Sequence, residues 1–318
     1  MATTIEPPTV HTPPPRTRRV MSTLREARPN GHGRPALLFL APFLVLYVLF
    51  VVGPAIYGLV MSFFDTSMVT SGLGTFAGLD NYAEALSSSD FWTALWHTLW
   101  FTILTTPPLI ALALVFALLA ERARRARWFF RLAFFLPYVL PSAVVALIWI
   151  WMYTPALGLL SRTMTALGFA EPNWLGDPDL AMVSLAITTV WWTLGFNFVL
   201  YLAGLQEIPR DLYEASAIDG AGPWQQIRLI TLPLLSRTTS LVVVLQIIAS
   251  MKVFDQMYIM TQGGPNFATR SVLEYIFDVG FTDFRSGYAA AATTLFFLAV
   301  LAVSTVWVVM TRRQEPEL

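Results

Sequence analysis

The sequence predicts an all-α protein that crosses a membrane six times. Three observations lead to this fold class. Hydrophobic residues make up 56% of the 318 residues and charged residues 13%, whereas a soluble domain has a charged share of ~25%. Six apolar stretches are each long enough to cross a hydrocarbon core of about 30 Å. Arginines gather in alternate connections between these stretches, as expected for loops on one side of a membrane.

The N-terminal part of the chain divides into a tail, one helix and a loop. Residues 1–34 are rich in proline, threonine and arginine, a composition that cannot bury a core and predicts a disordered tail. Residues 35–90 are expected to hold the first membrane helix, at about 36–60, and an external loop. Gly53 and Pro54 interrupt this helix and favour a kink.

Residues 91–310 are expected to form one domain of five membrane helices, and residues 311–318 a short cytoplasmic tail. The first two of these helices, at about 91–119 and 132–153, each contain two prolines. Backbone groups freed by such breaks need a partner in the protein or in a water-filled cavity. The other three helices are expected at about 181–204, 239–260 and 288–310.

The distribution of arginine indicates the orientation of the chain. Arginines cluster in the N-terminal tail, after the second helix, after the fourth helix and in the C-terminal tail. The other connections hold only Arg162, Arg270 and Arg285. Because cytoplasmic loops carry the excess of positive charge, both termini and the connection between the fourth and fifth helices are expected in the cytoplasm.

The connection from Asp211 to Leu235 is rich in small and polar residues. Asp211 followed by Glu214 is typical of a helix start, because both side chains can accept bonds from free backbone N–H groups. Gly220 can end that helix at positive φ, and Pro223 suits the first position of a second helix. The sequence therefore predicts two short helices joined by a turn.

The same connection resembles the "EAA" coupling loop of the membrane subunits of ABC importers, with the pattern E-A-A, three residues, G, nine residues, I-x-L-P. The family's second alanine is replaced by Ser216. The resemblance implies that the loop docks into a groove on an ATP-hydrolysing subunit and transmits its motion to the membrane helices. The residues that match the pattern, or are expected near the docked surface, are Glu214, Ala215, Ser216, Asp219, Gly220, Ile230, Leu232 and Pro233.

Further segments resemble the carbohydrate branch of these permeases, the maltose-permease-like group. They are Phe76–Tyr82, Phe254–Tyr258 with the following Thr261–Pro265, and Gly287–Ala291. The resemblance covers roughly residues 36–310, and it implies that residues 91–310 form a type-1 ABC transmembrane domain. The Gly-Gly-Pro part of Thr261–Pro265 fits a tight turn and a contact with a binding protein equally well.

The resemblance also implies partners and a location. The chain would translocate a sugar, or a sugar-like polyol phosphate, across a bacterial cell membrane that it crosses several times. A second, homologous permease, a pair of ATP-binding subunits and an extracytoplasmic solute-binding protein would complete the importer. ATP and magnesium would be bound by the partner ATPase, and no cofactor, metal or nucleic acid is expected on this chain.

Polar side chains inside the fourth and fifth helices predict a substrate pathway, because such groups are costly in a membrane unless they are paired or face a cavity. Indole and phenol rings beside amides and hydroxyls suit a sugar; helix–helix hydrogen bonding and an interfacial aromatic belt are the alternative. Lys252 and Asp255, three residues apart, are expected to share a helix face. The expected pathway residues are Trp191, Trp192, Asn197, Tyr201, Gln246, Ser250, Lys252, Asp255, Gln256 and Tyr258.

Other functions find less support in the residues. The single lysine, Lys252, follows Met251, so a phosphate-binding G-x-x-x-x-G-K-[ST] loop is absent. The chain has no cysteine, which excludes thiol catalysis and thiolate metal sites. An ion-coupled carrier would need acidic residues deep in the membrane, where Asp255 is the single candidate. A membrane enzyme would need a cluster of catalytic groups, and none is found.

Overall fold

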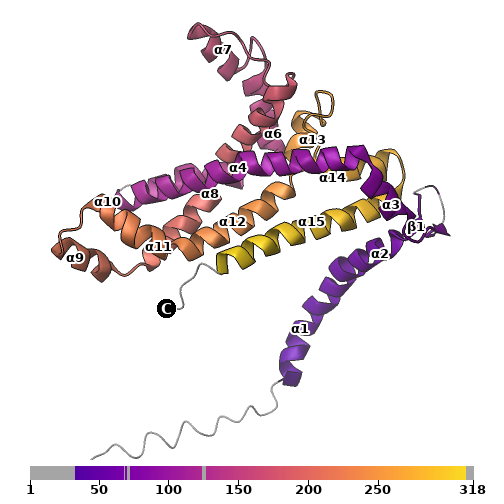
Figure 1. The fold of residues 1–318 in the computed structure, drawn as a ribbon, viewed down its shortest axis with the longest axis horizontal. Coiled ribbons are helices and arrows are strands. Elements are labelled where there is room, and N and C mark those ends of the chain that lie inside the picture. The colour runs from indigo at the N-terminus through magenta and orange to yellow at the C-terminus, as the bar shows by residue number, and fades with distance from the viewer. Residues whose placement is uncertain (1–32, 68, 70–71, 124–126, 313–318) are drawn as a thin grey trace, which may run out of the picture. The chain divides into compact units, whose positions relative to one another are not determined.

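A computed structural model describes residues 33–67, 69, 72–123 and 127–312 (Figure 1). The expected tails therefore lie almost entirely outside the described residues. Contacts divide the chain into two units, residues 1–56 and 57–318.

The described part of the first unit is helical throughout. It consists of α1 (Gly33–Tyr47), the π-helical turn η1 (Val48–Val52) and the start of α2 (Gly53–Met61). Gly53 donates its N–H to the carbonyl of Val48, five residues back. The irregularity expected at Gly53-Pro54 therefore takes the form of one wide turn directly before the proline, and the helical path continues.

The second unit begins with a small structure at one end of the helices. A two-stranded antiparallel sheet, β1 (Phe64–Asp65) with β2 (Thr75–Phe76), follows α2 and leads into α3 (Asp80–Ser87). Asn81 donates from Nδ2 to the carbonyls of Ser62 and Phe64, at 3.0 and 2.9 Å. The Gly-Leu-Asp-Asn-Tyr segment thus holds the backbone between α2 and the sheet.

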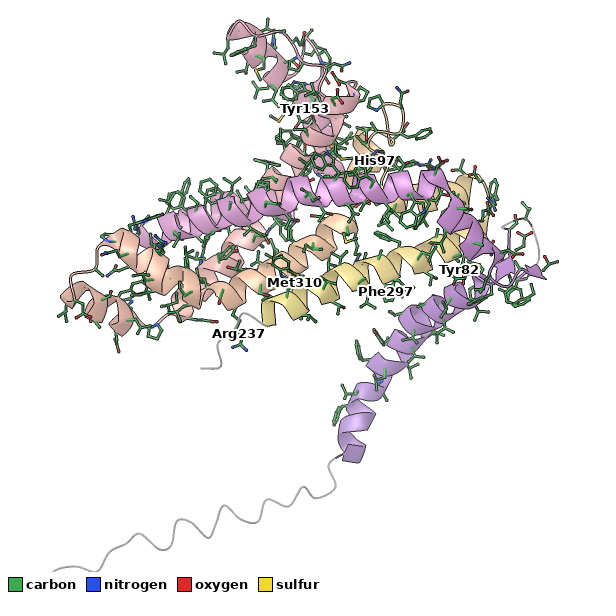
Figure 2. All side chains as sticks on the ribbon, viewed as in Figure 1. Tyr82, His97, Tyr153, Arg237, Phe297 and Met310 are labelled. Atoms are coloured by element: carbon green, nitrogen blue, oxygen red, sulfur yellow. The ribbon has the colours of Figure 1, made fainter. Side chains whose placement is uncertain are left out.

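Long helices form the body of the second unit (Figure 1). α4 packs against α8 and α12, and α12 packs against α15. Figure 2 labels Phe297, which lies on α15 with 61% of its surface exposed. The helices of this unit from α4 to α12, with α15, are α4 (Ser89–Arg122), α5 (Arg127–Val139), α6 (Ser142–Tyr153), α7 (Leu159–Ala166), α8 (Pro178–Glu207), α12 (Ser236–Met251) and α15 (Ser286–Arg312); the short helices between α8 and α12 and between α12 and α15 are given below.

Small residues allow α4 and α8 to approach closely. Ala113, Ala117 and Ala120 of α4 are buried against Phe198 and Leu202 of α8, both also fully buried. Small side chains at such spacing let helix backbones pack without large groups between them. A Cβ on Gly195 of α8 would collide with the backbone of α5, so α5 packs on α8 in the same manner.

Four of the described helices are long and apolar enough to cross a membrane, and six if each of two bent pairs is counted as one span. The expected third helix consists of α5 and α6, which meet at 96°. Pro141 lies between them and cannot continue a helical hydrogen-bond ladder. The second bent pair is Pro223–Leu234 with Ser236–Met251, which meet at 61°. The expected fifth helix is also divided at its other end, because α12 ends at Met251 and α13 (Asp255–Met260) follows after a break.

The connection after α13 contains a buried acidic residue. It includes α14 (Val272–Phe277) and the π-helical turn η3 (Asp278–Thr282). Glu274 is 2% exposed, and its Oε2 has no hydrogen-bond partner. Arg270 pairs with Asp278 at 2.7 Å. Burial raises the pKa of Glu274 to about 7; repulsion from Asp278 adds to the rise and attraction to Arg270 opposes it.

This pKa predicts a pH-dependent stability. The folded state holds the proton of Glu274 more tightly than the unfolded chain does, so stability falls as pH rises from the unfolded value near 4.5 through about 7. Glu274→Gln keeps the neutral shape and removes this loss. We expect Glu274→Gln to raise the free energy of unfolding at pH 8 by at most about 3 kcal/mol. The melting temperature in detergent should therefore rise at pH 8 and change little at pH 5.

Glu84→Gln is the matched control with the opposite sign. Arg285 donates to both carboxylate oxygens of Glu84 at 2.7 Å, and this hydrogen bonding lowers the pKa of Glu84. Glu84→Gln should therefore lower the free energy of unfolding at pH 8 and change it little at low pH. Identical pH profiles for Glu274→Gln and the unaltered protein would show that the fold does not raise the pKa of Glu274.

Candidate functional site

A cavity of about 300 Å³ lies where the two broken helices meet α8. Tyr138 and Ser142 approach from the α5–α6 break, and Lys252, Phe254 and Asp255 from the α12–α13 break. The remaining lining residues are Phe101, Thr189, Trp192, Thr193, Gln246, Ala249, Ser250, Val253 and Gln256.

Side-chain bonds join the two breaks to each other and to α8. Ser142, the first residue of α6, donates its hydroxyl to Asp255, the first residue of α13, at 2.8 Å. Trp192 of α8 donates its indole N–H to the carbonyl of Leu140 at 3.2 Å. Leu140 directly precedes the break at Pro141, so the indole satisfies a carbonyl at the interrupted helix end. Residues at the two helix breaks therefore form part of the cavity wall and are bonded to each other and to α8.

One buried amide is left with a free donor. Gln256 is 3% exposed, and its Oε1 accepts from the hydroxyl of Thr189 at 2.7 Å. Its Nε2 has no hydrogen-bond partner, and the residue lines the cavity. A buried N–H group without a partner costs free energy. A ligand hydroxyl or carbonyl in the cavity could satisfy it.

The helix face expected to carry Lys252 and Asp255 does not exist, because α12 ends at Met251 and α13 begins at Asp255. No salt bridge joins these two residues, both of which the structure describes. The Asp255 carboxylate is bonded to Ser142 instead. Both charged side chains are exposed and both line the cavity, so a ligand there meets a cation and an anion.

Other expected pathway residues form a buried polar chain between helices. Asn197 of α8 donates to Gln246 of α12 at 3.0 Å. Gln246 donates to Ser250 at 2.9 Å, and the Ser250 hydroxyl lies 3.0 Å from that of Thr105 on α4. This chain joins three helices through buried polar side chains.

The structure thus separates the ten expected pathway residues into two sets. Six line the cavity: Trp192, Gln246, Ser250, Lys252, Asp255 and Gln256. The other four are not among its lining residues. Of these, Asn197 and Tyr201 are buried, and Trp191 and Tyr258 are 40% and 36% exposed.

Sequence reasoning missed several lining residues, among them Tyr138, Ser142, Thr189 and Phe254. Two prolines in the expected third helix were a signal that could have found Tyr138 and Ser142, because Tyr138 directly follows Pro137 and Ser142 directly follows Pro141. No proline or glycine marks the break at 252–254, so the sequence offered no comparable signal for Phe254.

The loop between α8 and α12 has the predicted pair of short helices. α9 (Arg210–Ile218) is followed by a turn in which Gly220 has φ +85°. α10 (Pro223–Gln226), the π-helical turn η2 (Ile227–Thr231) and α11 (Leu232–Leu234) then lead to α12. Asp211 is not the N-cap, because α9 begins one residue earlier, after Pro209. The Asp211 carboxylate still lies in the first turn of α9, where a negative charge interacts favourably with the helix dipole.

Hydrogen bonds between the two short helices hold the shape of this loop. Gln226 donates to the carbonyl of Tyr213 at 3.1 Å and to the hydroxyl of Ser216 at 3.0 Å. The phenol of Tyr213 lies 2.9 Å from the hydroxyl of Thr231. Ser216, the residue that departs from the family pattern, is therefore part of the link. Tyr213, Gln226 and Thr231 were not among the expected loop residues.

The outer surface of the loop is partly apolar. Ile218, Trp224 and Leu229 are 88%, 72% and 68% exposed. The residues of the expected coupling pattern are also at or near the surface: Glu214, Ala215, Asp219, Gly220, Leu232 and Pro233 are exposed, and Ser216 and Ile230 are half-buried. Large exposed apolar side chains on a small loop are typical of a protein contact.

Comparison with known proteins gives consistent matches. A family model described as "binding-protein-dependent transport system inner membrane component" matches residues 110–316. The chain is 34% identical to the sulfoquinovosyl glycerol transport system permease protein of Agrobacterium fabrum, over 88% of this chain and 91% of that protein. It is also 34% identical to the trehalose/maltose transport system permease protein of Thermococcus litoralis, over 85% and 91%.

Two further matches agree with these. The sn-glycerol-3-phosphate transport system permease protein of Agrobacterium fabrum is 32% identical, over 84% of this chain and 91% of that protein. Among solved structures, a bacterial ABC transporter involved in alginate import has a chain with a TM-score of 0.75 and 24% identity, covering 89% of this chain and 97% of that chain. This last likeness concerns the fold.

The link between the short helices can be tested by Gln226→Leu. The change removes two hydrogen bonds, each worth about 1 kcal/mol. We expect amide hydrogen exchange in residues 210–233 to become roughly thirtyfold faster in detergent, because local opening becomes easier. Gln206→Leu, at an exposed position on α8, is the control and should leave this exchange unchanged. Unaltered exchange in Gln226→Leu would mean that other contacts hold the loop.

Proposed function

Because the chain belongs to the family of inner-membrane components of binding-protein-dependent transport systems, we propose that it is the permease subunit of an ATP-driven sugar importer. The observation that carries the sugar assignment is the cavity at the two helix breaks. It combines the rings of Trp192 and Phe254 with the free donor of Gln256. Sugars present apolar C–H faces together with many hydroxyl groups, and such a mixed lining suits both.

The relatives narrow the chemical class of the substrate. Their names give a sulfoquinovosyl glycerol, trehalose or maltose, and sn-glycerol-3-phosphate. All are polyhydroxylated, and they include neutral and anionic compounds. A cavity that offers both the Lys252 ammonium and the Asp255 carboxylate is compatible with this range. We propose a sugar or sugar-like polyol derivative as the substrate of this chain as well.

The coupling of transport to ATP is proposed to run through α9–α11. In the proposed orientation, with six spans and both termini in the cytoplasm, this loop faces the compartment that contains ATP. Ile218 and Trp224 would bury their exposed surface in a groove of the ATP-hydrolysing partner. The hydrogen bonds of Gln226 and Tyr213 would keep the loop rigid. Movement at the ATPase would then displace α8 and α12 together.

We propose that the chain works in a bacterial cell membrane beside a second permease, a pair of ATPase subunits and a solute-binding protein. ATP and magnesium would be held by the ATPase partner. The family and the named relatives are components of transport systems, so an ion-coupled carrier acting alone is not favoured.

Affinity purification from the native membrane tests the assembly. A tagged form of this chain, extracted in several mild detergents, should bring with it an ATPase, a second permease and a binding protein, as identified by mass spectrometry. The binding protein can then be screened against sugars to define the substrate. Recovery of the chain alone in every detergent would contradict the importer assignment and favour a carrier.

The cavity assignment is tested by Gln256→Leu in the purified importer. The change removes a donor for a substrate oxygen and the acceptor for Thr189 while nearly keeping the side-chain volume. We expect uptake of the sugar retained by the binding protein to need about fivefold more loaded binding protein, since one hydrogen bond is worth about 1 kcal/mol. Gln206→Leu is the control. Uptake kinetics equal to those of the unaltered importer would exclude Gln256 from the pathway.

A further inference from the structure

Four aromatic rings form a continuous group at the broken end of α12. Phe254 and Tyr258 stack with ring centroids 5.3 Å apart, and Phe277 lies 5.4 Å from Phe254 and 5.3 Å from Tyr258. Phe281 stacks on Phe277 at 5.1 Å. We call these four residues the aromatic track. They come from the α12–α13 break, from α13, from α14 and from η3.

The track starts at the cavity and leads away from it. Phe254 lines the cavity, and Phe281 is connected to it through Phe277. The cavity end of α12 lies far from the coupling loop, because the 16 residues of α12 (Ser236–Met251) separate them by about 24 Å at the rise of an α-helix. In the proposed orientation, the track therefore lies at the end of the bundle where a substrate would arrive from outside.

The rings are not simply core residues. Phe281 is 58% exposed and Tyr258 is 36% exposed, whereas Phe254 and Phe277 are half-buried. Part of the ring surface is thus open along the track. The inner end carries polar groups, because Lys252 and Asp255 are exposed beside Phe254 and line the same cavity.

We propose that the aromatic track is an outer sugar subsite, continuous with the cavity, for a glycan of more than one ring. This proposal rests on the proposed function and extends it to the length of the substrate. An acyl chain would bury apolar surface against the rings, but it could not form hydrogen bonds with the ammonium of Lys252 and the carboxylate of Asp255 at the inner end. A sugar chain gains from both, since its C–H faces pack on aromatic surface and its hydroxyls bond to charged and amide groups.

Chain length is the property that this arrangement would select. A disaccharide fills the cavity and leaves the track empty. A longer glycan places its additional rings over Phe277 and Phe281 and buries their exposed surface. The track thus adds affinity for each further ring, while contacts inside the cavity stay the same.

The test compares short and long glycans on the complete importer in lipid nanodiscs. The probes are maltose with maltotetraose and cellobiose with cellotetraose, and binding is measured by saturation-transfer NMR. For at least one pair we expect the tetrasaccharide to bind about threefold to tenfold more tightly than the disaccharide. Phe281→Ala should bring that ratio close to one without changing the affinity for the disaccharide. Phe297→Ala, at an equally exposed ring on α15, should keep the ratio.

Three outcomes would overturn the proposal. The first is an unchanged ratio in Phe281→Ala. The second is loss of the second permease from the purified Phe281→Ala complex, which would assign the track to a subunit interface. The third is absence of binding by all four probes. In each case the importer function remains a separate question, decided by the co-purified partners and by uptake of the sugar that the binding protein retains.

Discussion

The constraint on which the structure depends is that polar backbone groups inside a membrane must be satisfied without water. Unbroken helices meet it internally, as α4, α8 and α15 do. The two broken spans cannot, and they meet side by side with each other and with α8. The Trp192 indole donates a hydrogen bond to the carbonyl of Leu140, directly before Pro141. The Ser142 hydroxyl donates to the carboxylate of Asp255, the first residue of α13. Both bonds lie at the wall of the cavity, which combines polar and apolar side chains.

The same constraint explains why polar residues of α8, α12 and α13 have two different roles. Asn197, Gln246 and Ser250 bond one another and reach α4, so they hold helices together, and Gln246 and Ser250 also line the cavity. Gln256 has one atom bonded and one atom free, so it holds α8 and still offers a donor to the cavity. A composition count of polar residues cannot separate these roles, because both place amides and hydroxyls in apolar helices.

Much of the fold could be predicted from the sequence, for physical reasons that differ between elements. The membrane helices follow from apolar length, and the α9–α10 turn from Gly220 and Pro223, whose backbone preferences are local. The angle at Pro141 and the break at 252–254 depend on neighbouring helices, and only the first has a local signal. Tyr213, Gln226 and Thr231 were missed because their bonds join residues on different helices. Phe254 was missed because no proline or glycine marks the break at 252–254, whereas Pro137 beside Tyr138 was a signal that the sequence did offer.

The position of Lys252 has a practical consequence. It is the single lysine of the chain, and it is exposed on the cavity wall. Apart from the chain's N-terminus, it is therefore the one place where an amine-reactive reagent can attach. A reagent of this kind would act as a chemical reporter of the cavity, modified when the wall is accessible and shielded when a solute or a closed conformation covers it.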